Sequence, residues 1–184
     1  MAGKFQEYLR AGRVFYGSTA AAGVAFPITT GTAITFGVWA SDPNIVVVPL
    51  KFNAGYTSGT IALGSIGFAA QNIGFTVGTA APCTALTSGT SRNAKIGAGN
   101  AARATFVPAT ATLTAGNGAA VPVHYAGKCI ESATAGLGIW SLDYEFDDIC
   151  AVMPGNIMWV ASSVAQTGLF SMSMHWAEIP VQEF

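Results

Sequence analysis

Four carboxylates near residue 145 are the side chains of this sequence whose types and spacing could do chemistry. They are Asp143, Glu145, Asp147 and Asp148. Carboxylate oxygens at strand spacing can share a Ca²⁺ ion, and a pair of acids that flank a sugar can hydrolyse a glycosidic bond. A solvated acidic face, or one that meets a basic segment of a neighbouring chain, requires neither ion nor substrate. We favour this third interpretation, and we predict no metal, no cofactor and no catalytic residue.

Other chemical motifs are missing from the sequence. It contains no GxSxG nucleophile elbow, no GxxxxGK[ST] phosphate loop and no HExxH zinc motif. His124 and His175 lie in segments predicted to be strands, where a single histidine is more often an ordinary residue than a ligand. Cys83, Cys129 and Cys150 are odd in number and have no CxxC spacing, so we predict reduced, mostly buried thiols.

The pattern around the acids predicts the element that carries them. Large apolar residues occupy every second position from 140 to 146, and Asp143, Glu145 and Asp147 alternate with them. Such alternation is typical of a β-strand with one face in the core and the other in solvent. The segment 170–176 alternates in the same way. The apolar residues are Trp140, Leu142, Tyr144 and Phe146 in the first segment, and Phe170, Met172, Met174 and Trp176 in the second.

The rest of the chain follows a strand–turn–strand pattern. Strands are predicted around 24–28, 34–38 and 45–52, the glycine-rich segment 78–104 is expected to be a long excursion, and Asn117-Gly118 predicts a hairpin. About eight to ten short strands at turn-spaced intervals indicate an all-β fold. We predict one domain over residues 13–184, a jelly-roll-like antiparallel β-sandwich.

Residues 1–12 are predicted to be a separate N-terminal arm. Phe5, Tyr8 and Leu9 are spaced as one face of a short helical turn, and Arg10 and Arg13 add charge beside it. Such an arm can fray in solvent or dock on a neighbouring chain. The apolar patch favours docking, so these five residues are our candidate assembly contacts.

Charge is scarce in this chain and sorted by sign. Only 9% of the residues are charged, and 51% are hydrophobic, whereas about a quarter of an ordinary soluble domain is charged. No acid occurs from Pro43 to Ile130, and no base occurs from Glu131 to the end. We therefore expect much of the surface to be covered by copies of the same chain or by a larger assembly. The basic middle and the acidic end can pair within one sandwich, or between subunits in a head-to-tail contact that closes into a ring.

Nucleic acid and membrane are not expected partners. The formal net charge is −1 and the pI is about 6.0, so no overall positive field attracts nucleic acid. The apolar runs break after a few residues, as in Ile45-Val46-Val47-Val48-Pro49, whereas a membrane-spanning helix needs about twenty apolar residues.

The two ends of the sequence resemble small structural proteins of tailed-bacteriophage virions. The resemblance lies in GSTAAAGVAFPI at 17–28, in MPGN at 153–156, in VAS at 160–162 and in HWAEIP at 175–180. In those proteins a Pro-Gly turn leads into a strand hairpin that ends in a Trp-x-Glu-x-Pro-like tail. The resemblance covers the two ends and the Gly-, Ala- and Thr-rich texture of the chain.

The resemblance implies a non-enzymatic jelly-roll protein, made in the host cytoplasm and incorporated into a virion. It implies a homo-oligomer, often a trimer, that contacts other virion proteins such as the major capsid protein. A head decoration or cement protein is the favoured member of this class. The alternative is a phage spike or receptor-binding module for host glycan, which predicts an exposed aromatic near Trp39 or within residues 78–104.

Overall fold

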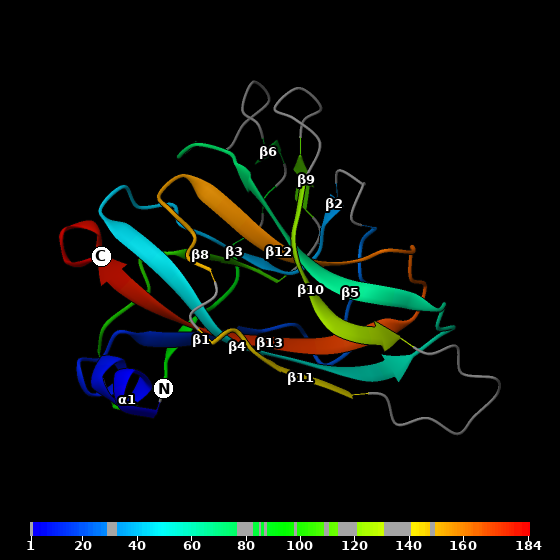
Figure 1. Cartoon of the computed structure of the whole chain (residues 1–184), viewed down its shortest axis with the longest axis horizontal. Coiled ribbons are helices and arrows are strands. Elements are labelled where there is room, and N and C mark those ends of the chain that lie inside the picture. Colours follow the sequence, from blue (N-terminus) through cyan, green and yellow to red (C-terminus); the bar gives the residue numbers. More distant parts are fainter. Residues whose placement is uncertain are drawn as a thin grey trace.

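The computed structural model describes residues 2–28, 33–76, 83–84, 86, 88–97, 99–108, 111–113, 121–130, 141–147 and 150–184. These residues form one helix, α1 (Ala2–Arg10), a 3₁₀ turn η1 (Val181–Glu183) and strands β1 to β13. The strands form two five-stranded antiparallel sheets and a small three-stranded sheet (Figure 1). The prediction of an all-β sandwich is therefore confirmed.

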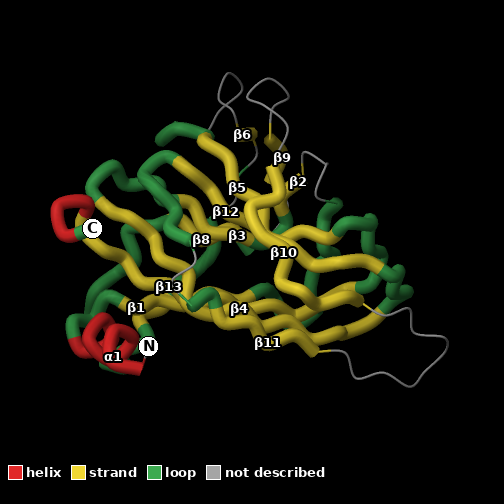
Figure 2. Tube along the Cα trace, viewed as in Figure 1, coloured by secondary structure: helices red, strands yellow, loops and turns green. Residues whose placement is uncertain are grey.

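The two large sheets lie face to face (Figure 2). The first sheet has the order β11 (Ser141–Glu145), β4 (Ile45–Ser58), β13 (Leu169–Pro180), β1 (Val14–Ser18), β7 (Arg92–Asn93). The second has the order β10 (Val121–Ile130), β5 (Gly64–Asn72), β12 (Asn156–Ser162), β3 (Gly37–Trp39), β8 (Thr105–Val107). The small third sheet has the order β2 (Ala33–Ile34), β9 (Ala111–Leu113), β6 (Cys83–Thr84).

The pairs formed by eight of these strands nest within one another along the chain. β1 pairs with β13, β3 with β12, β4 with β11 and β5 with β10, so that each pair lies inside the one before it. Successive pairs alternate between the first and the second sheet. β7 and β8 come from the long excursion between β5 and β10 and extend the two sheets beside β1 and β3.

Aromatic side chains fill the space between the two large sheets. Phe52 of the first sheet meets Phe68 of the second edge-on at 5.5 Å between ring centroids, and Phe106 of the second stacks on Trp176 of the first at 6.0 Å. The strand phases predicted from the sequence hold in this core. Leu142, Phe146, Phe170, Met172, Met174 and Trp176 are all buried.

The outer faces of both large sheets also carry buried apolar residues. On the second sheet, Trp39, Ile157 and Trp159 form a cluster with Ile34 of the third sheet. The expected exposure of Trp39 is therefore wrong: it is 5% exposed, and its indole Nε1 donates to the carbonyl oxygen of Gly74 at 2.9 Å. The sequence pattern placed Trp39 on the non-core face correctly, but that face is covered.

Helix α1 lies against the outer face of the first sheet. Tyr8 packs on a cluster that includes Val46, Val48, Ala177 and Ile179. The helical turn predicted from residues 5–9 is present, and it packs on its own chain. Both chain ends lie on the same side of the molecule, near α1 (Figure 1). Among the described residues, no helix is long and apolar enough to cross a membrane.

Two predictions for the middle of the chain have different outcomes. The segment 78–104, expected to be an excursion, contributes the short strands β6 and β7, each two residues long. The hairpin predicted at Asn117-Gly118 lies outside the described residues, as do Trp140 and Asp148.

Candidate functional site

The outer face of the first sheet brings the predicted acidic residues together with basic and aromatic side chains. Strand register aligns five residues in one row across the sheet: Glu145, Lys51, His175, Tyr16 and Arg92. Residues directly opposite one another on neighbouring strands point to the same face. We call this set the transverse row. It begins with an acid on one edge strand and ends with a base on the other.

A shallow groove with a mixed polar and apolar lining runs beside the transverse row. Its volume is about 480 Å³. Register places Asp143, Asn53, Ser173 and Ser18 in line across β11, β4, β13 and β1. The groove is lined by these four residues and by Thr19, Ala20, Ala21, Ala54, Gly55, Ser141, Leu142, Ser171 and Met172. The hydroxyl, amide and carboxylate groups of this lining can form hydrogen bonds with a partner surface, and small apolar side chains such as Ala20, Ala21 and Ala54 lie between them.

The predicted acidic face is exposed as expected. Asp143, Glu145 and Asp147 all point to solvent. Asp143 forms a salt bridge of 2.9 Å with Lys51 on the neighbouring strand. In the described parts of the chain, no three His, Cys, Asp or Glu side chains are grouped as metal ligands.

His175 lies at the centre of the transverse row, between Tyr16 and Lys51. Its ring stacks on Tyr16 with 5.7 Å between centroids. Its Nδ1 atom is buried and forms no hydrogen bond with the described part of the molecule. Burial lowers the pKa of His175 below its ordinary value of 6.5, and the positive charge of Lys51 lowers it further.

A basic edge closes the other end of the row. Arg92 is exposed on β7. Lys95 follows in the next turn, and its Nζ donates to the carbonyl oxygen of Arg10, at the end of α1, at 3.0 Å. The edge strand β7 and helix α1 therefore gather three bases, Arg10, Arg92 and Lys95, at one side of the molecule.

The structure separates the five candidate assembly contacts of the arm. Tyr8 and Leu9 are half-buried, whereas Phe5 is 41% exposed. Arg13 forms a bidentate ion pair with Glu183, with Nη2 and Oε1 at 3.0 Å, and this hydrogen bonding raises the pKa of Arg13 and lowers that of Glu183. Arg10 remains exposed. Contact of the arm with a neighbouring copy stays a prediction.

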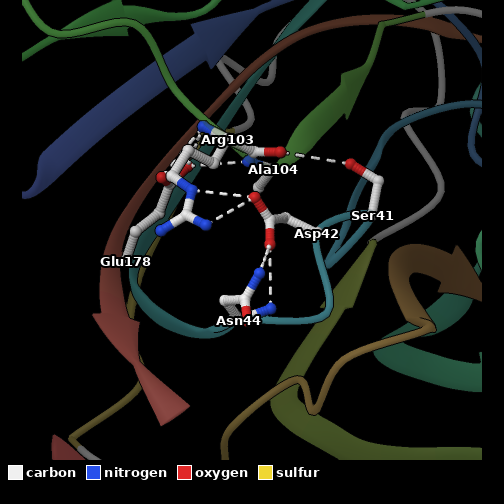
Figure 3. Close-up of polar contacts among 6 residues, drawn as sticks. All are labelled: Ser41, Asp42, Asn44, Arg103, Ala104 and Glu178. Atoms are coloured by element: carbon white, nitrogen blue, oxygen red, sulfur yellow. Dashed lines mark hydrogen bonds and ion pairs between the residues drawn. The ribbon is translucent and has the colours of Figure 1, made fainter. Parts of the chain in front are cut away.

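A buried carboxylate that was not predicted from the sequence, that of Glu178 on β13, lies against the backbone of Arg103 and Ala104 (Figure 3). Glu178 is 5% exposed, and its Oε1 accepts hydrogen bonds from the peptide nitrogen of Ala104 at 3.0 Å and from Trp176 Nε1 at 3.2 Å. Its Oε2 accepts the peptide nitrogen of Arg103 at 2.9 Å. Burial raises the pKa of Glu178, although these hydrogen bonds oppose the shift.

The side chain of Arg103 forms an ion pair with Asp42. Arg103 Nε lies 2.8 Å and Nη2 2.7 Å from Asp42 Oδ2, while Asp42 Oδ1 accepts the peptide nitrogen of Asn44 at 2.8 Å (Figure 3). These bonds to Asn44 and Arg103 lower the pKa of Asp42. Together, Glu178, Arg103 and Asp42 fasten the end of the excursion to the sandwich. A 370 Å³ hollow beside them is lined by Arg13, Asn100 and other residues.

A sequence signal for Glu178 was present. Phe170, Met172, Met174 and Trp176 occupy inward positions at every second residue, and Glu178 is the next position in that series. An acid in the inward phase of a strand predicts a buried carboxylate with dedicated donors. Of the three cysteines, Cys150 is a half-buried free thiol whose pKa is raised by burial. The side chains of Cys83, Cys129 and His124 lie outside the described set.

Comparison with known proteins gives no family for this chain. No family model matches the sequence, and no curated protein matches it. Among solved structures, the VP2 subviral particle of infectious bursal disease virus aligns at 11% identity and a TM-score of 0.20, covering 93% of this chain and 42% of VP2. The chain thus spans less than half of the VP2 length, and a likeness this weak supports no conclusion about fold or function.

Proposed function

We propose that this chain is a non-enzymatic structural protein of a virion that works by forming contacts with copies of itself and with other shell proteins. The observation that carries the proposal is the nested pairing of eight strands, β1–β13, β3–β12, β4–β11 and β5–β10. This pairing supports the jelly roll that we predict from the sequence, an architecture used by viral capsid and lectin domains.

The outer surface supplies a second argument, because fold alone does not define function. The outer face of the first sheet presents a shallow groove with a mixed lining and two oppositely charged edges. Only 9% of the residues of the chain are charged, so charge repulsion between copies is weak. Both features favour a protein that is covered by neighbours in its working state.

The finer assignment is a bacteriophage head decoration or cement protein, most simply a trimer. It rests on the resemblance of segments 17–28, 153–156, 160–162 and 175–180 to such proteins. The glycan-binding alternative predicted an exposed aromatic side chain near Trp39 or within residues 78–104. Trp39 is buried, and residues 78–104 contain no aromatic residue, so neither place supplies one.

The proposal is tested on particles. An antibody raised against the purified chain should label intact virions of the virus that encodes it, and mass spectrometry of purified particles should detect the chain at a stoichiometry comparable with that of shell proteins. A chain found only in infected-cell lysate, and never in purified particles, would refute the proposal. Binding to a glycan array would favour the spike alternative instead.

A further inference from the structure

About half of the charged side chains that the structure describes form no salt bridge with the described residues, and most of these are sorted in space by sign. Salt bridges join Arg13 to Glu183, Lys51 to Asp143 and Arg103 to Asp42. The remaining charged side chains that the structure describes, apart from Glu178 with its backbone donors, are the acids Glu7, Glu145 and Asp147 and the bases Arg10, Arg92 and Lys95. None of these six forms a salt bridge within the described residues.

The three unpaired bases lie together at one edge of the first sheet. Arg92 belongs to the edge strand β7, and Lys95 is bonded through Nζ to the backbone of Arg10 at the end of α1. We call Arg10, Arg92 and Lys95 the basic edge.

Two of the three unpaired acids lie at the opposite edge of the same sheet. Glu145 is the last residue of the edge strand β11, and Asp147 follows two residues later. We call Glu145 and Asp147 the acidic edge. The transverse row joins the two edges through four inter-strand steps, from Glu145 to Arg92. At about 4.8 Å a step, their backbones lie about 19 Å apart, so the edges are too distant to neutralise each other within one molecule.

We propose that the acidic edge of one copy docks against the basic edge of a second copy of this chain, in a head-to-tail contact. The inference rests on the proposed function, for which it supplies the contact between copies. Both edges are strands with a free side in the part of the chain that the structure describes: β11 pairs only with β4, and β7 only with β1. Opposite charges brought together across such an interface steer association and fix its register.

The separation of acids and bases onto opposite edges favours a head-to-tail contact over a two-fold symmetric contact. A two-fold contact through β11 would place two acidic edges in one interface, and one through β7 would place two basic edges in one interface. Like charges facing each other in an interface cost several kcal/mol. A head-to-tail contact avoids both repulsions, and repeated around an axis it closes into a ring, of which a trimer is the smallest case.

Charge reversal on the full-length chain tests the contact, with mass measured by light scattering at low and at high salt. The wild-type chain should associate at low salt and dissociate as salt rises. Glu145→Lys and Arg92→Glu should each raise the dissociation constant by about tenfold or more. Both side chains are exposed, so circular dichroism and the melting temperature should not change.

Two further samples separate a direct contact from an indirect effect. The double variant Arg92→Glu/Glu145→Lys should regain association, because its edges are again complementary. A mixture of the two single variants should also associate. Each variant faces its own copies with like charges and the other variant with opposite charges, so the two variants should alternate and form species with an even number of chains. Glu7→Lys is the comparison for net charge: it changes the net charge as Glu145→Lys does, but it adds positive charge on α1, which also carries Arg10 of the basic edge, and it should therefore strengthen association instead of weakening it.

Two results would overturn the contact. One is a wild-type chain that associates while both single reversals associate equally well, which would place the interface elsewhere and leave the proposed virion function standing. The other is a wild-type chain that stays monomeric at low salt and high protein concentration. This result would show that the two edges do not bind each other, and that any partner of theirs is a different protein. The virion function itself is judged separately, by the labelling of particles.

Discussion

The carboxylate of Glu178 and the peptide nitrogen of Arg103, 75 residues apart in the sequence, are joined by a hydrogen bond of 2.9 Å. The donor is the backbone of Arg103, while the Arg103 guanidinium binds Asp42. A buried carboxylate thus positions a loop whose own charged side chain remains at the surface. This arrangement holds the excursion after β7 against β13.

Removal of the Glu178 carboxylate should destabilise the fold. In Glu178→Ala, the peptide nitrogens of Arg103 and Ala104 and the indole Nε1 of Trp176 lose their acceptor. Unsatisfied buried donors cost about 1–3 kcal/mol each before relaxation, so we expect a loss of about 2–4 kcal/mol in the free energy of unfolding. Urea denaturation measures it. Glu178→Gln keeps one carbonyl acceptor and should lose clearly less. Equal losses would contradict the role given to these hydrogen bonds.

Because the pKa of Glu178 is raised in the folded state, the free energy of unfolding should fall as the pH rises. Between the ordinary pKa of 4.5 and the raised folded-state value, the folded chain holds a proton that the unfolded chain has released. Folding is then favoured by acid, and stability falls as pH rises through this window. The difference in unfolding free energy between wild type and Glu178→Gln isolates this effect, since other acids cancel. A difference that is flat with pH would show that the hydrogen bonds fully offset the burial of the charge.

His175 should make the free energy of unfolding fall as the pH decreases, the opposite of the effect of Glu178. Its folded-state pKa lies below 6.5, so below pH 6.5 the unfolded chain binds a proton that the folded chain does not. The contribution is fully present above pH 6.5 and is lost as pH falls through and below that value. Denaturation from pH 5 to 8 should show wild type losing stability on acidification relative to His175→Gln. Parallel curves for the two proteins would argue against the buried, neutral histidine.

Tyr8 should contribute to stability through the helix that it anchors. Tyr8→Ala removes the ring that covers Val46, Val48, Ala177 and Ile179, and partial exposure of this cluster should cost about 1–2 kcal/mol. Phe5→Ala is the matched control on the same helix, because Phe5 is 41% exposed and should change stability by less than about 0.5 kcal/mol. Thermal melts compare the two, and a larger effect at Phe5 than at Tyr8 would reverse the packing assigned to α1.

Gly37 is required by the close approach of β3 to β12. A Cβ at this position would lie 2.4 Å from the carbonyl oxygen of Met158, which is backbone and cannot rotate away. Gly37→Ala should therefore cost about 3 kcal/mol or more. Gly99→Ala is the control: a Cβ there would meet nothing within 4 Å, and the melting temperature should stay within a degree or two of wild type.

The sequence allowed the strand phases to be predicted but not the layers outside them. Alternation fixed the buried side of β11 and β13, because a period of two leaves only one face for large apolar residues. It could not reveal that the other face of the second sheet is also covered, which is why Trp39 was misplaced. That information depends on the third sheet, whose strands β2, β9 and β6 come from distant parts of the chain.

The candidate site was accessible from the sequence only in part. Exposure of Asp143, Glu145 and Asp147 followed from the alternation, and the separation of bases from acids along the chain was visible directly. Their location on opposite edges of one sheet was not, since it requires the register of β11, β4, β13, β1 and β7. The two-residue strand β7, which carries Arg92, has too few residues to show a period.

The pairing of β1 with β13 also has a consequence for synthesis of the chain. The hydroxyl oxygen of Thr19 accepts a hydrogen bond from the peptide nitrogen of Met172, 153 residues later, so β1 cannot find its neighbour until translation has passed β13. Folding dominated by such distant pairs is slow. We expect nascent chains on the ribosome to lack a completed first sheet, so that only chains synthesised beyond β13 can be recruited into an assembly.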